Sequence, residues 1–149
     1  MSTRSITVAI TSLIVAVAPT FAAAEALVPT NTYTEEWVYR VKYESKEEWW
    51  KIFQKYQIGE LDELKRRGDV LSYSVVRANL HTDNAARWDY RVIVTFKDFA
   101  AVPVVMARED EILDKLFPDT EARKRAEARR WELTLNHWDL PIAEIDPHK

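Results

Sequence analysis

Apolar and polar residues alternate in the middle of the chain in a way that predicts three strands. Trp37 to Tyr43 and Trp88 to Phe96 place aromatic or aliphatic side chains at every second position. Val70 to Leu80 is a further strand-like run, and the polar link 81–86 joins it to the Trp88 run. Side chains on a strand alternate between its two faces, so each run has one apolar face to bury. The two runs around the short link predict an antiparallel hairpin.

Helical spacing fills the interval between the first two strands. Ser45 and Glu48 have the spacing of a capping box, in which each side chain satisfies a free amide at the start of a helix. Gly59 is expected to interrupt this helix, and Gly68 to end it after two arginines.

A second helical interval follows the hairpin. It begins at Asp98 as a cap or near Pro103, breaks at 117–120, and resumes from about Glu121 to His137. Leu140 to Ile145 predicts a short final strand. The order β-α-β-β-α-β is the split βαβ, or ferredoxin-like, α+β arrangement, which predicts a four-stranded antiparallel sheet with helices on one face.

Residues 1–24 have the pattern of an export signal. Arg4 is the only charged residue before Glu25, the run from Ile6 to Val17 is mostly apolar, and small residues precede the Ala24–Glu25 bond. A transmembrane helix needs about 20 apolar residues, more than this run provides. We therefore expect cleavage, no stable membrane span afterwards, and a periplasmic or extracellular protein. A retained membrane anchor is the alternative.

The rest of the chain is expected to form one domain, 36–146, between a flexible leader, 25–35, and a tail, 147–149. It contains no cysteine, which excludes disulfides and cysteine metal sites. Its charges are interspersed and the full chain has a net charge of −3, which argues against nucleic acid as a partner. Two glycines cannot build a phosphate-cradling loop, and three scattered histidines lack ligand spacing. We expect no metal and no cofactor.

The element order gives the domain a family resemblance. With the aromatic strand Trp37–Val41, the hairpin Val70–Phe96 and the closing segment His137–Ile142, it resembles the dimeric α/β-barrel superfamily, which includes antibiotic-biosynthesis monooxygenase-like, EthD-like and NIPSNAP-like proteins. This resemblance implies that two sheets pair face to face in a homodimer. It also implies that small ligands bind between the sheet and the helices of a subunit, or near the barrel mouth.

The strand pattern independently favours pairing. If the aromatic rows face the helices, the opposite row carries Val38, Arg40, Arg91 and Ile93. A sheet face without helices meets either water or a partner, and arginine is favoured at interfaces. Arg40 and Arg91 could also hold a carboxylate or phosphate, or pair with acidic residues on adjacent strands.

Three residues on one row of the second strand, which His81 ends, are catalytic candidates. His81, Tyr73 and Arg77 follow the same strand row, and a histidine titrates near neutral pH. The structural alternative is that His81 only marks the entry to a loop.

Aromatic residues supply candidate ligand contacts. We expect His137, Trp88, Tyr90 and Trp131 to line an apolar pocket. The alternatives are a plain aromatic core and, for His137, a favourable position at a helix C-terminus. The basic run 121–130 is expected to be a solvated helix face, with a weak contact to an anionic surface as the alternative.

Two functions remain open. The first is an exported homodimer that binds a small, partly apolar ligand or a protein partner without catalysis. The alternative is a cofactor-independent oxygenase or isomerase acting on an aromatic or polyketide-like substrate. A histidine that faces a cavity, with tyrosine or arginine in reach, would favour the enzyme.

Overall fold

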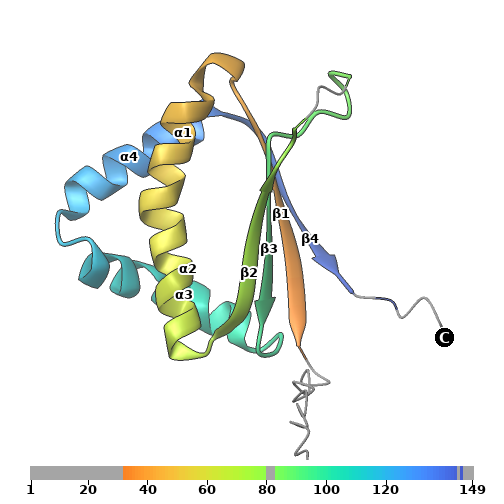
Figure 1. Ribbon diagram of the computed structural model, residues 1–149. Helices are drawn as coiled ribbons and strands as arrows, with labels where there is room; N and C mark the ends of the chain where they lie inside the picture. Colours follow the sequence, from red (N-terminus) through yellow and green to blue (C-terminus); the bar gives the residue numbers. More distant parts are fainter. Residues whose placement is uncertain (1–31, 80–82, 144, 146–149) are drawn as a thin grey trace, which may run out of the picture.

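One antiparallel sheet and a layer of helices account for the fold in the computed structural model, which describes residues 32–79, 83–143 and 145. The strands are β1 Tyr33–Val41, β2 Val70–Arg77, β3 Tyr90–Phe96 and β4 Thr134–Ile142. The helices are α1 Lys46–Phe53, α2 Gly59–Arg67, α3 Ala101–Leu116 and α4 Thr120–Leu133, with short turns η1 Tyr43–Ser45 and η2 Gln54–Ile58. The strand order is β2-β3-β1-β4, and all helices lie on one face (Figure 1). The predicted ferredoxin-like arrangement is confirmed.

The first helical region is continuous from α1 through the π-helical η2 into α2. Gly59 has helical dihedrals, φ −59° and ψ −39°, so the predicted interruption there is wrong. The glycine instead allows a close approach: a Cβ at this position would lie 2.9 Å from Cζ of Phe117. Gly68 does end the helix, at φ 80°, where only glycine is unstrained.

The predicted capping box does not form. The Ser45 side chain makes no cap hydrogen bond. Glu48 is instead bound by Arg129 of α4, whose Nε donates over 2.7 Å. Arg129 binds the Glu48 carboxylate in place of the local backbone amide, because charge-assisted hydrogen bonds are stronger than neutral ones.

The first strand starts earlier than predicted. β1 begins at Tyr33, so residues 33–35 belong to the sheet and not to a flexible leader. The Tyr33 ring lies 4.9 Å from that of Phe99, and the hydroxyls of Thr34 and Thr95 lie 3.1 Å apart across the β1–β3 pair. The predicted signal peptide, the earlier part of the leader and the tail 147–149 lie outside the described residues.

The last strand also starts earlier, and here the helix prediction is wrong. α4 ends at Leu133 and β4 runs from Thr134, so His137 is on a strand and not at a helix C-terminus. β4 pairs with β1 over nearly its whole length, which satisfies the backbone of both. Thr134 also marks the change: its hydroxyl accepts from Nε1 of Trp49 and donates to the carbonyl of Arg130, each over 2.9 Å.

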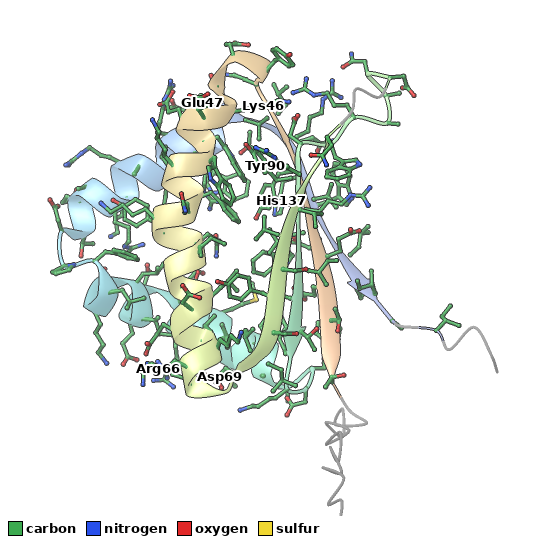
Figure 2. The ribbon with its side chains drawn as sticks, in the orientation of Figure 1. Lys46, Glu47, Arg66, Asp69, Tyr90 and His137 are labelled. Atoms are coloured by element: carbon green, nitrogen blue, oxygen red, sulfur yellow. The ribbon has the colours of Figure 1, made fainter. Side chains whose placement is uncertain are left out.

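Aromatic side chains of the sheet face the helices, as predicted. Trp49 of α1 stacks on Tyr90 at 4.8 Å and on Phe53 at 4.7 Å, and Tyr39 lies 5.0 Å away (Figure 2). Two predicted members of these rows differ: Tyr43 follows the end of β1 and is exposed in η1, and Trp88 precedes β3 and lies against Arg91.

The opposite sheet face carries the predicted mixed row. Val38 of β1 is in register with Arg91 on one side and Trp138 on the other. Arg91 pairs with Glu36 at 3.4 Å and covers the ring of Trp88 at 4.3 Å. The face also exposes large apolar side chains from both edge strands, which are Val76, Trp138, Leu140 and Ile142. No described helix covers this face, and none is long and apolar enough to cross a membrane.

Candidate functional site

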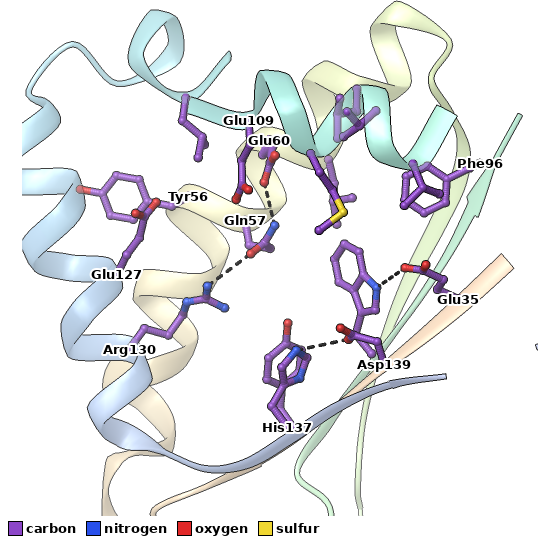
Figure 3. Close-up of a pocket in the computed structure, with 18 of the residues that line it drawn as sticks. Glu35, Tyr56, Gln57, Glu60, Phe96, Glu109, Glu127, Arg130, His137 and Asp139 are labelled. Carbon is purple, nitrogen blue, oxygen red and sulfur yellow. Dashed lines mark hydrogen bonds and ion pairs between the residues drawn. The ribbon is translucent and has the colours of Figure 1, made fainter. Parts of the chain in front are cut away.

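A cavity of about 380 Å³ opens between the sheet and the helices (Figure 3). Its apolar walls come from β1, β3, α2, α3 and α4. They include Trp37, Leu61, Leu64, Phe96, Val102, Val105, Met106, Leu113 and Trp131. Its polar lining comprises Glu35, Tyr39, Tyr56, Gln57, Glu60, Glu109, Glu127, Arg130, His137 and Asp139. Apolar walls with a few polar groups are typical of small-molecule sites.

Arg130 brings a buried positive charge to this cavity. Arg130 lies in the last turn of α4 and is only 7% exposed. Its guanidinium lies over the rings of Trp131 and Phe53. Nη2 donates to Oε1 of Gln57 over 3.4 Å, and the same amide donates to Glu60 over 2.7 Å. Nη1 has no hydrogen-bond partner within the described residues. The guanidinium therefore keeps a donor free at the cavity wall.

Glu60 places a carboxyl group at the same end. Glu60 is 4% exposed, and this burial raises the pKa of its carboxyl to about 8. The negative charges of Glu109 and Glu127 act in the same direction, whereas the positive charges of Arg130 and Arg123 oppose the rise. Burial disfavours the ionised form because the charge loses its hydration. At neutral pH the group therefore retains its proton and can donate a hydrogen bond.

His137 and Asp139 form a close side-chain contact at the cavity. Nδ1 of His137 lies 3.1 Å from the carbonyl oxygen of Val38, which can only accept, so Nδ1 donates. Nε2 then faces Oδ1 of Asp139 at 3.2 Å, and this contact is favourable only if one of the two atoms is protonated. Burial raises the pKa of the Asp139 carboxyl, while the His137 charge opposes the rise. The pair can give or accept a proton at the cavity.

Tyr39 connects these two ends of the site. Its ring stacks on the imidazole of His137 at 4.2 Å and 10°. Burial raises the pKa of its phenol to about 12, although the charge of Arg130 opposes the rise. The hydroxyl is therefore a neutral donor at physiological pH.

The structure brings two of the predicted ligand contacts to the cavity and leaves two outside it. His137 and Trp131 both line it, with ring centroids 5.3 Å apart. Tyr90 belongs to the aromatic stack on Trp49. Trp88 precedes β3 and lies against Arg91 on the open face, because the strand alternation does not extend back to it.

The predicted catalytic group does not assemble at this cavity. Tyr73 faces the helices, but its hydroxyl donates to Asp62 over 2.6 Å, and burial raises its pKa to about 12. Arg77 is exposed at the end of β2. Neither residue lines the cavity. His81 lies outside the described residues.

Arg130 and Glu60 were not among the predicted site residues. The basic run was expected to be a solvated face, which is wrong for Arg130 and for Arg123, which is 2% exposed. Arg123 binds Asp114 at 2.9 Å and Glu127 at 3.1 Å, and so ties α4 to α3. The two arginines lie two helical turns apart, and that spacing was the available signal. Glu60 lies on the apolar stripe of its helix, and a charged residue at such a position was a second signal of burial.

Metal chemistry has no site in the described part of the chain. Over residues 32–79, 83–143 and 145, no group of three or more histidine or acidic side chains is arranged to hold an ion.

Comparison with known proteins supports the fold. No family model and no curated sequence matches the chain. A dimeric ferredoxin-like protein from an uncultured marine organism is 9% identical, with a TM-score of 0.53 over 80% of this chain and 95% of that one. The hydroxynitrile lyase of Passiflora edulis is 12% identical, with a TM-score of 0.47 over 80% and 100%. SnoaB, a cofactor-independent oxygenase from Streptomyces nogalater, is 11% identical, with a TM-score of 0.42 over 78% and 95%. The marine protein shows a shared ferredoxin-like fold, and the scores of the two enzymes are too low to carry an argument about activity.

Proposed function

We propose that the chain binds a small, partly apolar molecule in the cavity between its sheet and its helices. The observation that carries this proposal is a space of about 380 Å³ whose apolar walls are interspersed with polar groups at both ends. A concave site of this size that combines apolar walls with oriented polar groups is typical of small-molecule binding.

A neutral fluorescent probe tests the binding. N-phenyl-1-naphthylamine brightens in apolar surroundings, and we expect saturable binding at about one probe per chain. Val105→Phe should abolish this signal, because Val105 lines the cavity and is 9% exposed. The matched control is Val104→Phe, one residue earlier on α3 and 55% exposed, which should bind as the wild type does. Equal binding by both variants would exclude the cavity as the site.

The His137–Asp139 pair favours a second candidate, acid–base catalysis in the same cavity. An isomerase, and an oxygenase that uses no cofactor, both need a base that removes a proton from an activated carbon. His137 lines the cavity and its Nε2 lies 3.2 Å from Oδ1 of Asp139, but Tyr39 contacts it by ring stacking and not by a hydrogen bond, so only the cavity-facing part of the condition for the enzyme hypothesis is met.

Hydrogen exchange at carbon tests this candidate. The protein should accelerate incorporation of deuterium from D₂O into the activated position of phenylacetone, as followed by proton NMR. His137→Gln should remove the acceleration, and Asp139→Asn should reduce it. Exchange at the uncatalysed rate with the wild-type protein would favour binding without catalysis.

We further propose that two copies pair through the open sheet face. Trp138 is 36% exposed there beside other large apolar side chains, and the similarly folded marine protein is dimeric. Trp138→Glu should shift the mass measured by light scattering from dimer to monomer. Val104→Glu, which adds the same charge on the helix side, should leave it unchanged. A monomeric wild type would refute the pairing.

Export is the remaining part of the proposal. A basic residue, an apolar run and small residues before Glu25 support cleavage after Ala24. Intact-mass analysis of the protein recovered from its source should give the chain that begins at Glu25, and a retained Met1 would contradict export by this route.

A further inference from the structure

We infer that the ligand of this cavity is a small organic acid, whose carboxylate binds the free Nη1 of Arg130 while its apolar body fills the aromatic end. This inference rests on the proposed binding function and specifies the class of ligand. It starts from two arginines of one helix that have unequal surroundings.

Arg123 and Arg130 are both buried on α4, but only Arg123 is neutralised. Three carboxylates surround Arg123, those of Asp110, Asp114 and Glu127. Arg130 makes no ion pair with any described residue, and its side chain interacts with two neutral groups, the amide of Gln57 and the phenol of Tyr39. A buried charge without a partner is strongly unfavourable. A ligand carboxylate would supply the missing acceptor.

Arg130 forms part of the cavity wall, and its Nη1 is shielded from solvent there. Nη1 is buried and unpartnered, and Arg130 lines the cavity (Figure 3). The guanidinium lies over the rings of Trp131 and Phe53, which fixes its plane. A planar fork with a free nitrogen is suited to a carboxylate, since arginine binds such groups in a directed geometry.

Glu60 reinforces this preference. The amide of Gln57 contacts both Arg130 and Glu60, so the two lie at the same end of the cavity. The protonated Glu60 carboxyl can donate to the second oxygen of a ligand carboxylate. The groups that influence Glu60 electrostatically come from three elements and are Glu109 on α3, Arg123, Glu127 and Arg130 on α4, and Tyr39 on β1. Loss of the Glu60 proton at alkaline pH would place two negative charges side by side.

Three probes that share one ring system separate the possible ligand classes. Calorimetry at pH 7 with the purified protein would compare 2-naphthoate, 2-naphthamide and 2-(aminomethyl)naphthalene. We expect naphthoate to bind at least about tenfold more tightly than the amide, the factor that corresponds to about 1.4 kcal/mol. Naphthoate affinity should also fall between pH 7 and 9 in the wild type, and Glu60→Gln should remove this fall.

Neighbouring arginines provide matched variants. Arg130→Gln should reduce the preference for naphthoate to about one, while Arg129→Gln should keep it, because Arg129 is exposed and pairs with Glu48. If Arg130→Gln does not fold, Arg130→Lys should lower the preference without abolishing it. Equal binding of amide and acid, or tighter binding of the amine, by the wild type would overturn the inference and leave the binding function intact. Failure of all three probes and of the neutral fluorescent probe would overturn both.

Discussion

Glu60→Gln is expected to stabilise the protein by an amount that grows with pH. Glu60 is buried, and its pKa is raised to about 8 from an ordinary value of 4.5. Below pH 4.5 the carboxyl is protonated in both the folded and the unfolded chain, so Glu60 adds no pH dependence to the free energy of unfolding. Between pH 4.5 and 8 the unfolded chain releases this proton while the folded chain retains it, so the free energy of unfolding falls as the pH rises.

The expected magnitude follows from the same two values. Each pH unit in this window costs about 1.36 kcal/mol, which amounts to roughly 3 kcal/mol at pH 7 and roughly 5 kcal/mol above pH 8. Glutamine keeps an acceptor for the Gln57 amide and cannot ionise, so the variant avoids the cost. A second carboxyl, Glu109, also has a pKa raised by burial and adds a smaller slope of the same sign in both proteins.

Urea denaturation followed by tryptophan fluorescence measures the effect at pH 4.5, 7 and 8.5. The difference between variant and wild type should be near zero at the lowest pH and largest at the highest. Glu47→Gln removes the same charge from the exposed first turn of α1 and should change stability by less than about 0.5 kcal/mol. A difference for Glu60→Gln that stays constant or shrinks as the pH rises would refute the buried, protonated carboxyl.

Other predictions concern the two glycines and Asp89, which precedes the inner strand β3. Gly59→Ala should destabilise the protein by about 1–2 kcal/mol in thermal unfolding, because the new methyl group meets Phe117. This loss should exceed the gain from alanine's better helix propensity. In a double-mutant cycle, Phe117→Leu should relieve the destabilisation. Gly68→Ala should cost about 1 kcal/mol through its positive φ, with no relief from Phe117→Leu. Asp89→Asn should cost about 3 kcal/mol at pH 7, because the buried carboxylate binds Lys46 at 2.5 Å. Burial opposes ionisation of Asp89, but its cationic and backbone partners lower its pKa overall, so this stability should be lost in the wild type as the pH falls below about 3.8.

The two arginines of α4 have different surroundings. Arg123 fixes α4 to α3 through carboxylates of both helices. Arg130, two turns later, contacts an amide and aromatic rings and keeps a donor free. The same residue type is therefore ion-paired at one position and without an ion pair at the other, and only its neighbours distinguish the two cases.

The sequence determined the fold because its strands have strong alternation. Trp37–Val41 and the hairpin from Val70 to Phe96 each bury one row of side chains, and a two-residue period allows only one assignment of faces. That is why Tyr39 and Tyr90 face the helices, and why Arg91 lies on the open side. Local patterns were weaker at the ends: Thr134 to Ile142 has helical spacing in its first part, yet it forms β4.

Only the tertiary structure decided the site. β4 forms because β1 offers it a free edge, and this pairing turns His137 and Asp139 toward the cavity. Arg130 and Glu60 belong to different helices, and nothing local distinguishes them from the solvated charges around them. Their burial, the raised pKa of Glu60 and the free donor of Arg130 arise from packing between segments distant in the chain. Charge effects of this kind depend on distance and hydration, which a residue pattern along one element does not contain.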